Sequence, residues 1–239
     1  MADDTEKGRD KGRQVSTQSQ VDAFLAKVRA APLPVPGQRG RLIFALDATA
    51  SREPTWDVAM QIQAEMFRET ASLGGLDIQL AYYRGLAEFV AGPWESRAPD
   101  LLARMAAVSC LAGQTQIAKL LAHARVEAQR GKVNALVFVG DCVEEDVDQL
   151  GRRAGELGLL GVRAFLFHEG ADPAARRAFE HIAKLTGGAC CPFDRASAGQ
   201  LKDLLSAVAV YAAGGRRALA DFSRRRGGAA LLLTHQLER

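Results

Sequence analysis

Two apolar runs that each end in an acid decide the fold of this sequence: RLIFALD (41–47) and VNALVFVGD (133–141). Neither run alternates between apolar and polar residues, which is the pattern of a strand covered on both faces. Strands of that kind occur in parallel sheets with helices on both sides. We therefore predict that strands 41–47 and 133–140 lie side by side in the middle of a sheet.

Strand and helix patterns alternate along the rest of the chain. We predict further strands at 77–83, 86–92, 162–168 and 189–193, and helices at about 54–72, 98–109, 115–130, 144–158, 173–185 and 197–213. This order predicts an α/β fold with a doubly wound, mostly parallel, six-stranded Rossmann-like sheet and helices on both faces. A turn at Arg84-Gly85 joins two of the strands in a hairpin, which adds one antiparallel edge strand.

Composition divides the chain into four parts. Residues 1–20 contain almost no apolar side chains and are expected to form a flexible polar tail. Residues 21–39 read as an N-terminal helix followed by a proline-rich linker. The α/β domain is assigned to 40–213, and 214–239 is an extension in which five arginines cluster.

The overall composition is that of an ordinary globular protein, with 239 residues, 48% of them hydrophobic, and a formal net charge of +3. No apolar run approaches the roughly 20 residues that a membrane-spanning helix needs. The first residues lack the apolar stretch of a secretory signal, so we expect a cytoplasmic protein without a membrane partner.

The four cysteines fit that compartment. They form no CxxC motif, and Cys190 and Cys191 are adjacent in sequence. We expect reduced thiols, with the adjacent pair pointing to opposite faces of strand 189–193.

Candidate site residues gather where the two central strands end. In a doubly wound sheet, ligands bind beyond the carboxyl ends of the strands, where the strand order reverses, and both Asp47 and Asp141 follow such ends. The loop after the first strand reads Asp47-Ala48-Thr49-Ala50-Ser51. The hydroxyls of Thr49 and Ser51 can turn back over the carboxylate, although Ser51 alone is more typical of a helix cap.

A third segment, LAGQTQIAKLL (111–121), adds another hydroxyl. Gly113 permits a tight backbone, and Thr115 stands at the predicted start of helix 115–130, where a helix cap is the simpler interpretation. Together, however, the three segments supply only oxygen donors, which suit a hard cation such as Mg²⁺.

In combination these segments resemble the von Willebrand factor type A (VWA) family, over about residues 40–213. That family has a strand ending in D-x-S-x-S, a Thr on a distant loop and an Asp after a later strand, which together form its metal-ion-dependent adhesion site (MIDAS). The matching positions here are Asp47, Thr49, Ser51, Thr115 and Asp141. Two departures are Thr49 in place of the first Ser and Cys142 in place of the Gly that often follows the second acid.

The resemblance implies a non-catalytic domain that binds a protein partner through a cation. Mg²⁺ is the expected ion, with Mn²⁺ or Ca²⁺ as alternatives. An open coordination position would take an Asp or Glu side chain of the partner. Intracellular bacterial members of the family are often linked with AAA+ ATPases, so an AAA+ ATPase is one candidate partner.

Two other functions stay open from sequence. A haloacid-dehalogenase-like phosphatase would use Asp47 as nucleophile and the acidic run 140–146 as its Mg²⁺ motif, but Thr49 stands where such enzymes usually carry a general acid. A nucleic-acid surface on the arginine-rich segment 216–226 lacks interleaved aromatic residues, and a solvated or partner-binding face is favoured. For His168 we expect a surface role, and for Cys142 no neighbouring base is apparent.

Overall fold

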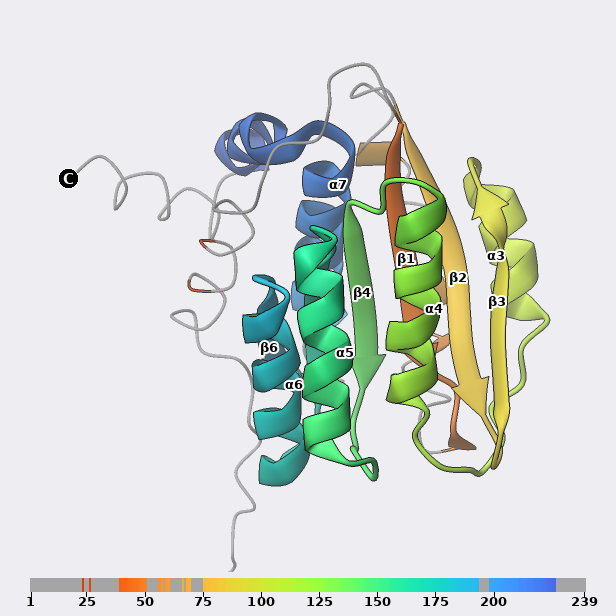
Figure 1. Cartoon of the computed structure of the whole chain (residues 1–239). Coiled ribbons are helices and arrows are strands. Elements are labelled where there is room, and N and C mark those ends of the chain that lie inside the picture. The colour runs from red at the N-terminus through yellow and green to blue at the C-terminus, as the bar shows by residue number, and fades with distance from the viewer. Residues whose placement is uncertain are drawn as a thin grey trace, which may run out of the picture.

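The computed structural model describes residues 39–50, 75–193 and 198–226, together with a few helical residues at 23, 26, 56–57, 59–60, 66 and 68–69 (Figure 1). The predicted helix at 54–72 is therefore described only in part, and the predicted helix at 21–31 lies almost wholly outside the described residues, as do the tail 1–20 and residues 227–239.

A six-stranded sheet forms the centre of the molecule, in the strand order β3-β2-β1-β4-β5-β6. Its strands are β1 (Gly40–Asp47), β2 (Leu76–Arg84), β3 (Glu88–Glu95), β4 (Ala135–Gly140), β5 (Arg163–Glu169) and β6 (Ala189–Phe193). All neighbouring pairs are parallel except β2 and β3, so β3 is an antiparallel edge strand. The predicted fold class, the central place of β1 and β4 and the edge hairpin are confirmed.

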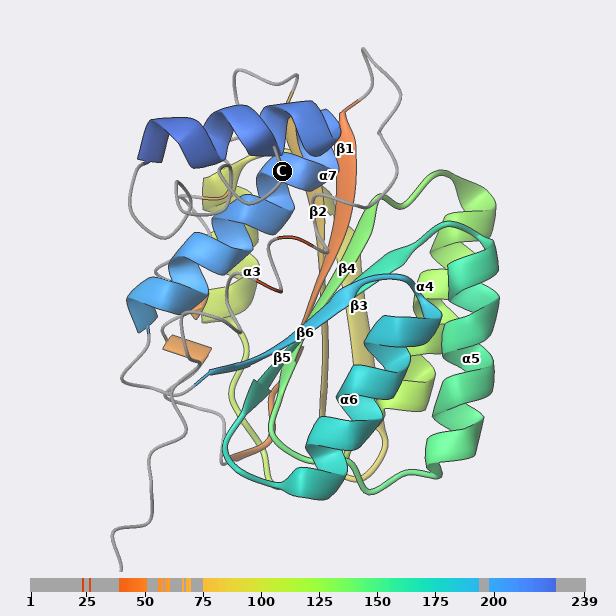
Figure 2. The ribbon, with the colours of Figure 1, turned by 90° about the vertical axis from the view of Figure 1, so that its left-hand side faces the viewer.

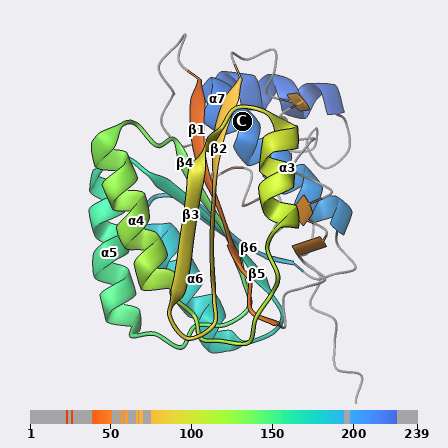
Figure 3. The ribbon, with the colours of Figure 1, turned by 90° about the vertical axis from the view of Figure 1, so that its right-hand side faces the viewer.

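Helices cover both faces of this sheet. The helices that the structure describes in full are α3 (Ala98–Ala106), α4 (Ile117–Arg130), α5 (Val147–Leu159), α6 (Pro173–Leu185) and α7 (Ala198–Arg226). Figure 2 shows α3 and α7 on one side of the sheet and α4, α5 and α6 on the other, and Figure 3 shows the same two layers from the opposite direction.

The apolar residues of β1 supply both cores at once, because successive side chains of a strand point to opposite faces. Leu42, Phe44 and Leu46 pack with residues of α3 and α7, whereas Ile43 and Ala45 pack with residues of α4, α5 and α6. This explains why the run 41–47 contains no polar alternation.

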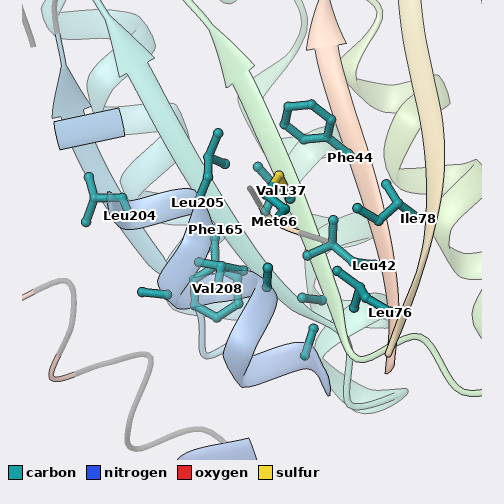
Figure 4. Close-up of a cluster of buried hydrophobic side chains, with 14 of the residues drawn as sticks. Leu42, Phe44, Met66, Leu76, Ile78, Val137, Phe165, Leu204, Leu205 and Val208 are labelled. Carbon is teal, nitrogen blue, oxygen red and sulfur yellow. The ribbon is translucent and has the colours of Figure 1, made fainter. Parts of the chain in front are cut away.

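The helix α7 packs unusually close to the start of β1. A Cβ added to Gly40 would lie 2.3 Å from the carbonyl oxygen of Ala212, so a glycine is needed there. On the same helix, Leu204, Leu205 and Val208 lie against the sheet (Figure 4).

The helical region at the end of the described chain is longer than the predicted 197–213. The helix breaks at Gly215, whose φ is 70°, and a second segment continues to Arg226. Ala218, Leu219 and Phe222 of that segment are buried, whereas Arg217 and Arg224 are exposed. The buried residues are spaced as on one face of a helix, but the arginines on either side of them in the sequence led us to end the predicted helix at residue 213.

Two segment boundaries near the carboxyl edge also differ from prediction. The helix α4 begins at Ile117 with Gln116 as its N-cap, so Thr115 lies before the helix and does not cap it. The edge strand β3 starts at Glu88, because a turn occupies 85–87 and Gly85 adopts a φ of 60° there.

The adjacent cysteines lie in β6 as expected. Cys191 belongs to the core shared with α7, and Cys190 packs against the core on the opposite face. None of the four cysteines, all of which are described, is in a disulfide. Among the helices of the described segments, none has the length and apolarity to cross a membrane.

Candidate metal centre

The predicted site residues that the structure describes line one pocket at the carboxyl edge of the sheet. The strands β2 and β4 end at the lower edge in Figure 1, and the strand order reverses between β1 and β4. A pocket of about 250 Å³ opens at this reversal. Its lining residues are Asp47, Thr49, Ala50, Ala112, Gly113, Thr115, Asp141, Cys142 and Glu144. Ser51, the fifth predicted ligand, lies outside the described residues.

The carboxylate of Asp47 is buried, with 3% of the residue exposed, and is held from two sides. Its Oδ1 accepts a hydrogen bond of 2.8 Å from the backbone N–H of Thr49, and its Oδ2 accepts one of 3.2 Å from the hydroxyl of Tyr83. These two bonds therefore fix the position of the Asp47 carboxylate at the pocket wall.

Tyr83 was missed by the sequence reasoning, although its place in β2 makes it a direct neighbour of Asp47 in the sheet register. Burial, and then the charge of Asp47, raise the pKa of the Tyr83 phenol well above its ordinary value. The phenol therefore stays protonated and acts as a donor to the carboxylate.

The loop between α3 and α4 carries Thr115 to the pocket. Its backbone is tied to the end of β1 by the N–H of Leu111, which donates to the carbonyl of Ala48 at 3.0 Å. It is tied to the β2–β3 turn by the N–H of Gln114, which donates to the carbonyl of Gly85 at 3.0 Å. Thr115 is only 7% exposed, so these ties bring a buried hydroxyl to the pocket wall.

The loop after β4 carries Asp141, which is half-buried, and three further acids. The carboxylate of Glu144 accepts from the backbone N–H of Thr115 at 2.9 Å, and the backbone N–H of Glu144 donates to Thr115 Oγ1 at 3.0 Å. The carboxylate of Glu145 accepts from the backbone N–H groups of Ile117 (2.7 Å) and Ala118 (2.8 Å).

The acid after these two, Asp146, caps the next helix in the chain. It is the N-cap of α5 and accepts from the backbone N–H of Gln149 at 2.8 Å. The acidic run that suggested a phosphatase motif thus holds the first turns of two helices. A sequence cannot reveal that partnership, because the acceptors and the amides of α4 are almost 30 residues apart.

Two other candidate residues differ from expectation in their chemistry. His168, for which a surface role was expected, is only 1% exposed and packs edge-on against Phe179, and burial lowers its pKa. Its expected surface role is therefore wrong, because the carboxyl end of β5 is covered by α6. Burial and then the carboxylates of Glu144 and Asp141 raise the pKa of the Cys142 thiol, so it remains protonated rather than nucleophilic.

The pocket thus combines carboxylates with threonine hydroxyls. Among the described residues, no three His, Cys, Asp or Glu side chains gather closely enough to hold a metal ion by themselves.

Sequence comparisons add nothing to this picture: no protein-family model matches the chain, and no curated protein matches it. Solved structures do match in fold. A von Willebrand factor type A protein from Catenulispora acidiphila superposes with a TM-score of 0.55 at 14% identity, over 72% of this chain and 43% of that one. The SpRpn10 VWA domain gives a TM-score of 0.51 at 13% identity, over 66% and 88% of the two chains.

A third match is proximal thread matrix protein 1 from the mussel byssus, in a structure described as having a zinc-occupied MIDAS motif. Its TM-score is 0.55 at 18% identity, over 74% of this chain and 47% of that one. The chain therefore spans less than half the length of two of these three proteins. At such identities the likeness concerns the fold, and the chain has a von Willebrand factor type A-like fold.

Proposed function

We propose that this chain is a non-catalytic protein-binding domain whose carboxyl-edge pocket binds a divalent cation and, through it, an acidic side chain of a protein partner. The observation that carries the proposal is the convergence of Asp47, Thr49, Thr115 and Asp141 on one pocket, from three separate segments of the chain. Ser51 is proposed as a fifth ligand from its place in the sequence.

The donor set fits a hard cation. Two carboxylates and two or three hydroxyls are the oxygen ligands that Mg²⁺ accepts, and Mn²⁺ or Ca²⁺ would find the same donors. When bound, the ion supplies a positive charge to which a carboxylate from outside the chain can bind.

The surroundings support a pocket that is shaped in advance. Tyr83 and the N–H of Thr49 fix the Asp47 carboxylate, and the ties of the α3–α4 loop fix Thr115. Ligands that are already in place lose little conformational freedom on binding an ion.

Similar structures support the class of function. The mussel byssus protein is described with a metal in its MIDAS motif, and the other two matches are described as VWA proteins or domains. A protein partner in an intracellular assembly, with an AAA+ ATPase as one candidate, remains our prediction from the family resemblance.

The phosphatase alternative draws no support from the site. A nucleophilic Asp47 would need a proton donor for the leaving group, and the residue two positions on is Thr49. The acids after Asp141 are bound to backbone amides, Glu144 to that of Thr115, Glu145 to those at the start of α4 and Asp146 to that of Gln149 in α5.

An affinity capture in three arms tests the proposal. The parent chain with Mg²⁺, the parent with a chelator and Thr115→Ala with Mg²⁺ are compared for retained proteins. We expect a partner that is retained only in the first arm and is lost when one of its own Asp or Glu residues is replaced. Equal retention in all three arms would contradict metal-dependent binding.

The same preparations separate the two functions by turnover. Mg²⁺-dependent hydrolysis of a generic phosphate ester by the parent, lost in Asp47→Asn, would favour the enzyme instead. We expect no hydrolysis from either chain.

A further inference from the structure

We infer that Glu144 is a positioning residue of the proposed cation site: it holds Thr115 at the pocket wall before a cation binds. The inference rests on the proposed function, because it assigns Glu144 a role in binding the same ion. Glu144 is not among the residues that the motif order picks out.

The contact between the two residues is reciprocal. The side chain of Glu144 accepts from the backbone of Thr115, and the backbone of Glu144 donates to the side chain of Thr115, at 2.9 and 3.0 Å. The donation to Oγ1 occupies one lone pair of the hydroxyl and limits its orientation. The second lone pair remains available as a ligand.

The reciprocal contact joins two of the loops that line the pocket, the α3–α4 loop and the loop after β4. One loop brings Thr115 and the other brings Asp141, and the two meet across the reversal of strand order. Since both residues are proposed ligands, the distance between their loops decides whether one ion can reach both. Groups that orient metal ligands in this way typically change metal affinity about 10–100-fold when they are removed.

Glu145 provides a natural comparison, because it is the next residue and also binds backbone amides, in its case within the first turn of α4. Its two acceptor oxygens contact Ile117 and Ala118, and α4 has neither a side-chain cap at Gln116 nor an acid in its first turn. Glu145 therefore stabilises the helix start. Only Glu144 of the two lines the pocket.

The experiment compares Glu144→Ala, Glu144→Gln and the matched control Glu145→Ala in the full chain, with Mn²⁺ alone as the calorimetric probe. We expect Glu144→Ala to bind Mn²⁺ about tenfold more weakly than the parent. Glu144→Gln keeps an oxygen that can accept from the Thr115 amide, so it should recover part of that loss. Glu145→Ala should lower the melting temperature but keep the parent's affinity.

A second readout needs no cation. In the metal-free protein, the backbone amide of Thr115 should exchange its hydrogen faster in Glu144→Ala than in the parent. In Glu145→Ala the faster exchange should instead appear at Ile117 and Ala118. A Thr115 amide whose exchange is unchanged in Glu144→Ala would overturn the positioning role.

The calorimetric results test whether Glu144 also contributes to cation affinity. Equal losses of affinity in the two alanine variants, no loss in either, or a Glu144→Gln variant as weak as Glu144→Ala would contradict the inference. A parent chain that binds no cation would refute the proposed function, whereas the exchange measurement would still report whether Glu144 fixes Thr115.

Discussion

The backbone of Gly113 lies directly against the backbone of Gly85: a Cβ on Gly113 would stand 2.0 Å from the Gly85 carbonyl oxygen. This contact packs the α3–α4 loop against the β2–β3 turn. It thereby fixes the position of Thr115, two residues after Gly113, at the pocket. No side chain fits between two backbones at that separation.

Gly113→Ala should therefore displace the loop and destabilise the fold by about 1–3 kcal/mol. Gly155 in α5 offers a matched control, since a Cβ there meets nothing within 4 Å. Gly155→Ala should be neutral or stabilising, by up to about 1 kcal/mol. Urea unfolding of the two variants checks both expectations, and a Gly113→Ala chain as stable as the parent would show that the loop is not held at Gly85.

The hydrogen bond from Tyr83 to Asp47 gives a second prediction. Tyr83→Phe leaves a buried carboxylate without one donor, and hydrogen bonds to charged groups contribute about 1.5–3 kcal/mol. We expect a loss of unfolding free energy of that size. The neighbouring Tyr82→Phe, which removes a hydroxyl from the half-buried residue on the other face, should cost much less. Equal losses would mean that the bond to Asp47 contributes nothing specific.

The stability of the fold should depend on pH through Glu127, which is buried near the C-terminal end of α4, the end away from the pocket. Its carboxylate accepts from Trp94 Nε1 (2.8 Å), Arg130 (2.9 Å) and Arg41 (3.2 Å), and the Arg41 guanidinium lies 3.9 Å from the centre of the Trp94 ring. Burial by itself raises the pKa of Glu127, but the hydrogen bonds from Trp94 and Arg130, together with the charges of His123 and Arg130, lower it, so the pKa is lowered overall.

A carboxyl whose pKa is lower in the folded than in the unfolded chain stabilises the fold above its unfolded pKa, and this contribution is lost as the pH falls through the folded value. The stability of the parent should thus decline in acid, from about pH 4.5 downward. Glu127→Gln should be less stable at neutral pH and show a shallower decline. Parallel curves for the two chains would exclude Glu127 as a source of the acid sensitivity.

How far the sequence predicts this molecule depends on where the determining contacts lie. The uninterrupted apolar residues of 41–47 and 133–140 indicate directly that both strands are buried on both faces. The central strand pair, the parallel sheet and the edge hairpin were therefore predictable from local sequence patterns. The convergence of Asp47 and Asp141 follows next, because parallel strands share a carboxyl edge, whereas Thr115 was assigned to the same site through the family resemblance.

Residues that act through partners far along the chain were not predictable in this way. Glu144 and Glu145 were considered only as part of a phosphatase motif, and their role as acceptors shows once the amides of residues 115–118 are placed beside them. Tyr83 reads as an ordinary strand residue until its register with Asp47 is known. His168 was expected at the surface because its strand ends there, and only the packing of α6 buries it.

The central claim is tested most directly by calorimetric titration of the full chain with Mn²⁺ and Mg²⁺, beside Asp47→Ala and Thr115→Ala. Both substitutions remove oxygen donors from the pocket, and Thr115→Ala removes only one hydroxyl, so the fold should survive it. The account predicts one divalent cation per parent chain, no measurable binding by Asp47→Ala and clearly weakened binding by Thr115→Ala. A parent that binds neither cation, or an Asp47→Ala variant that binds as the parent does, would contradict it.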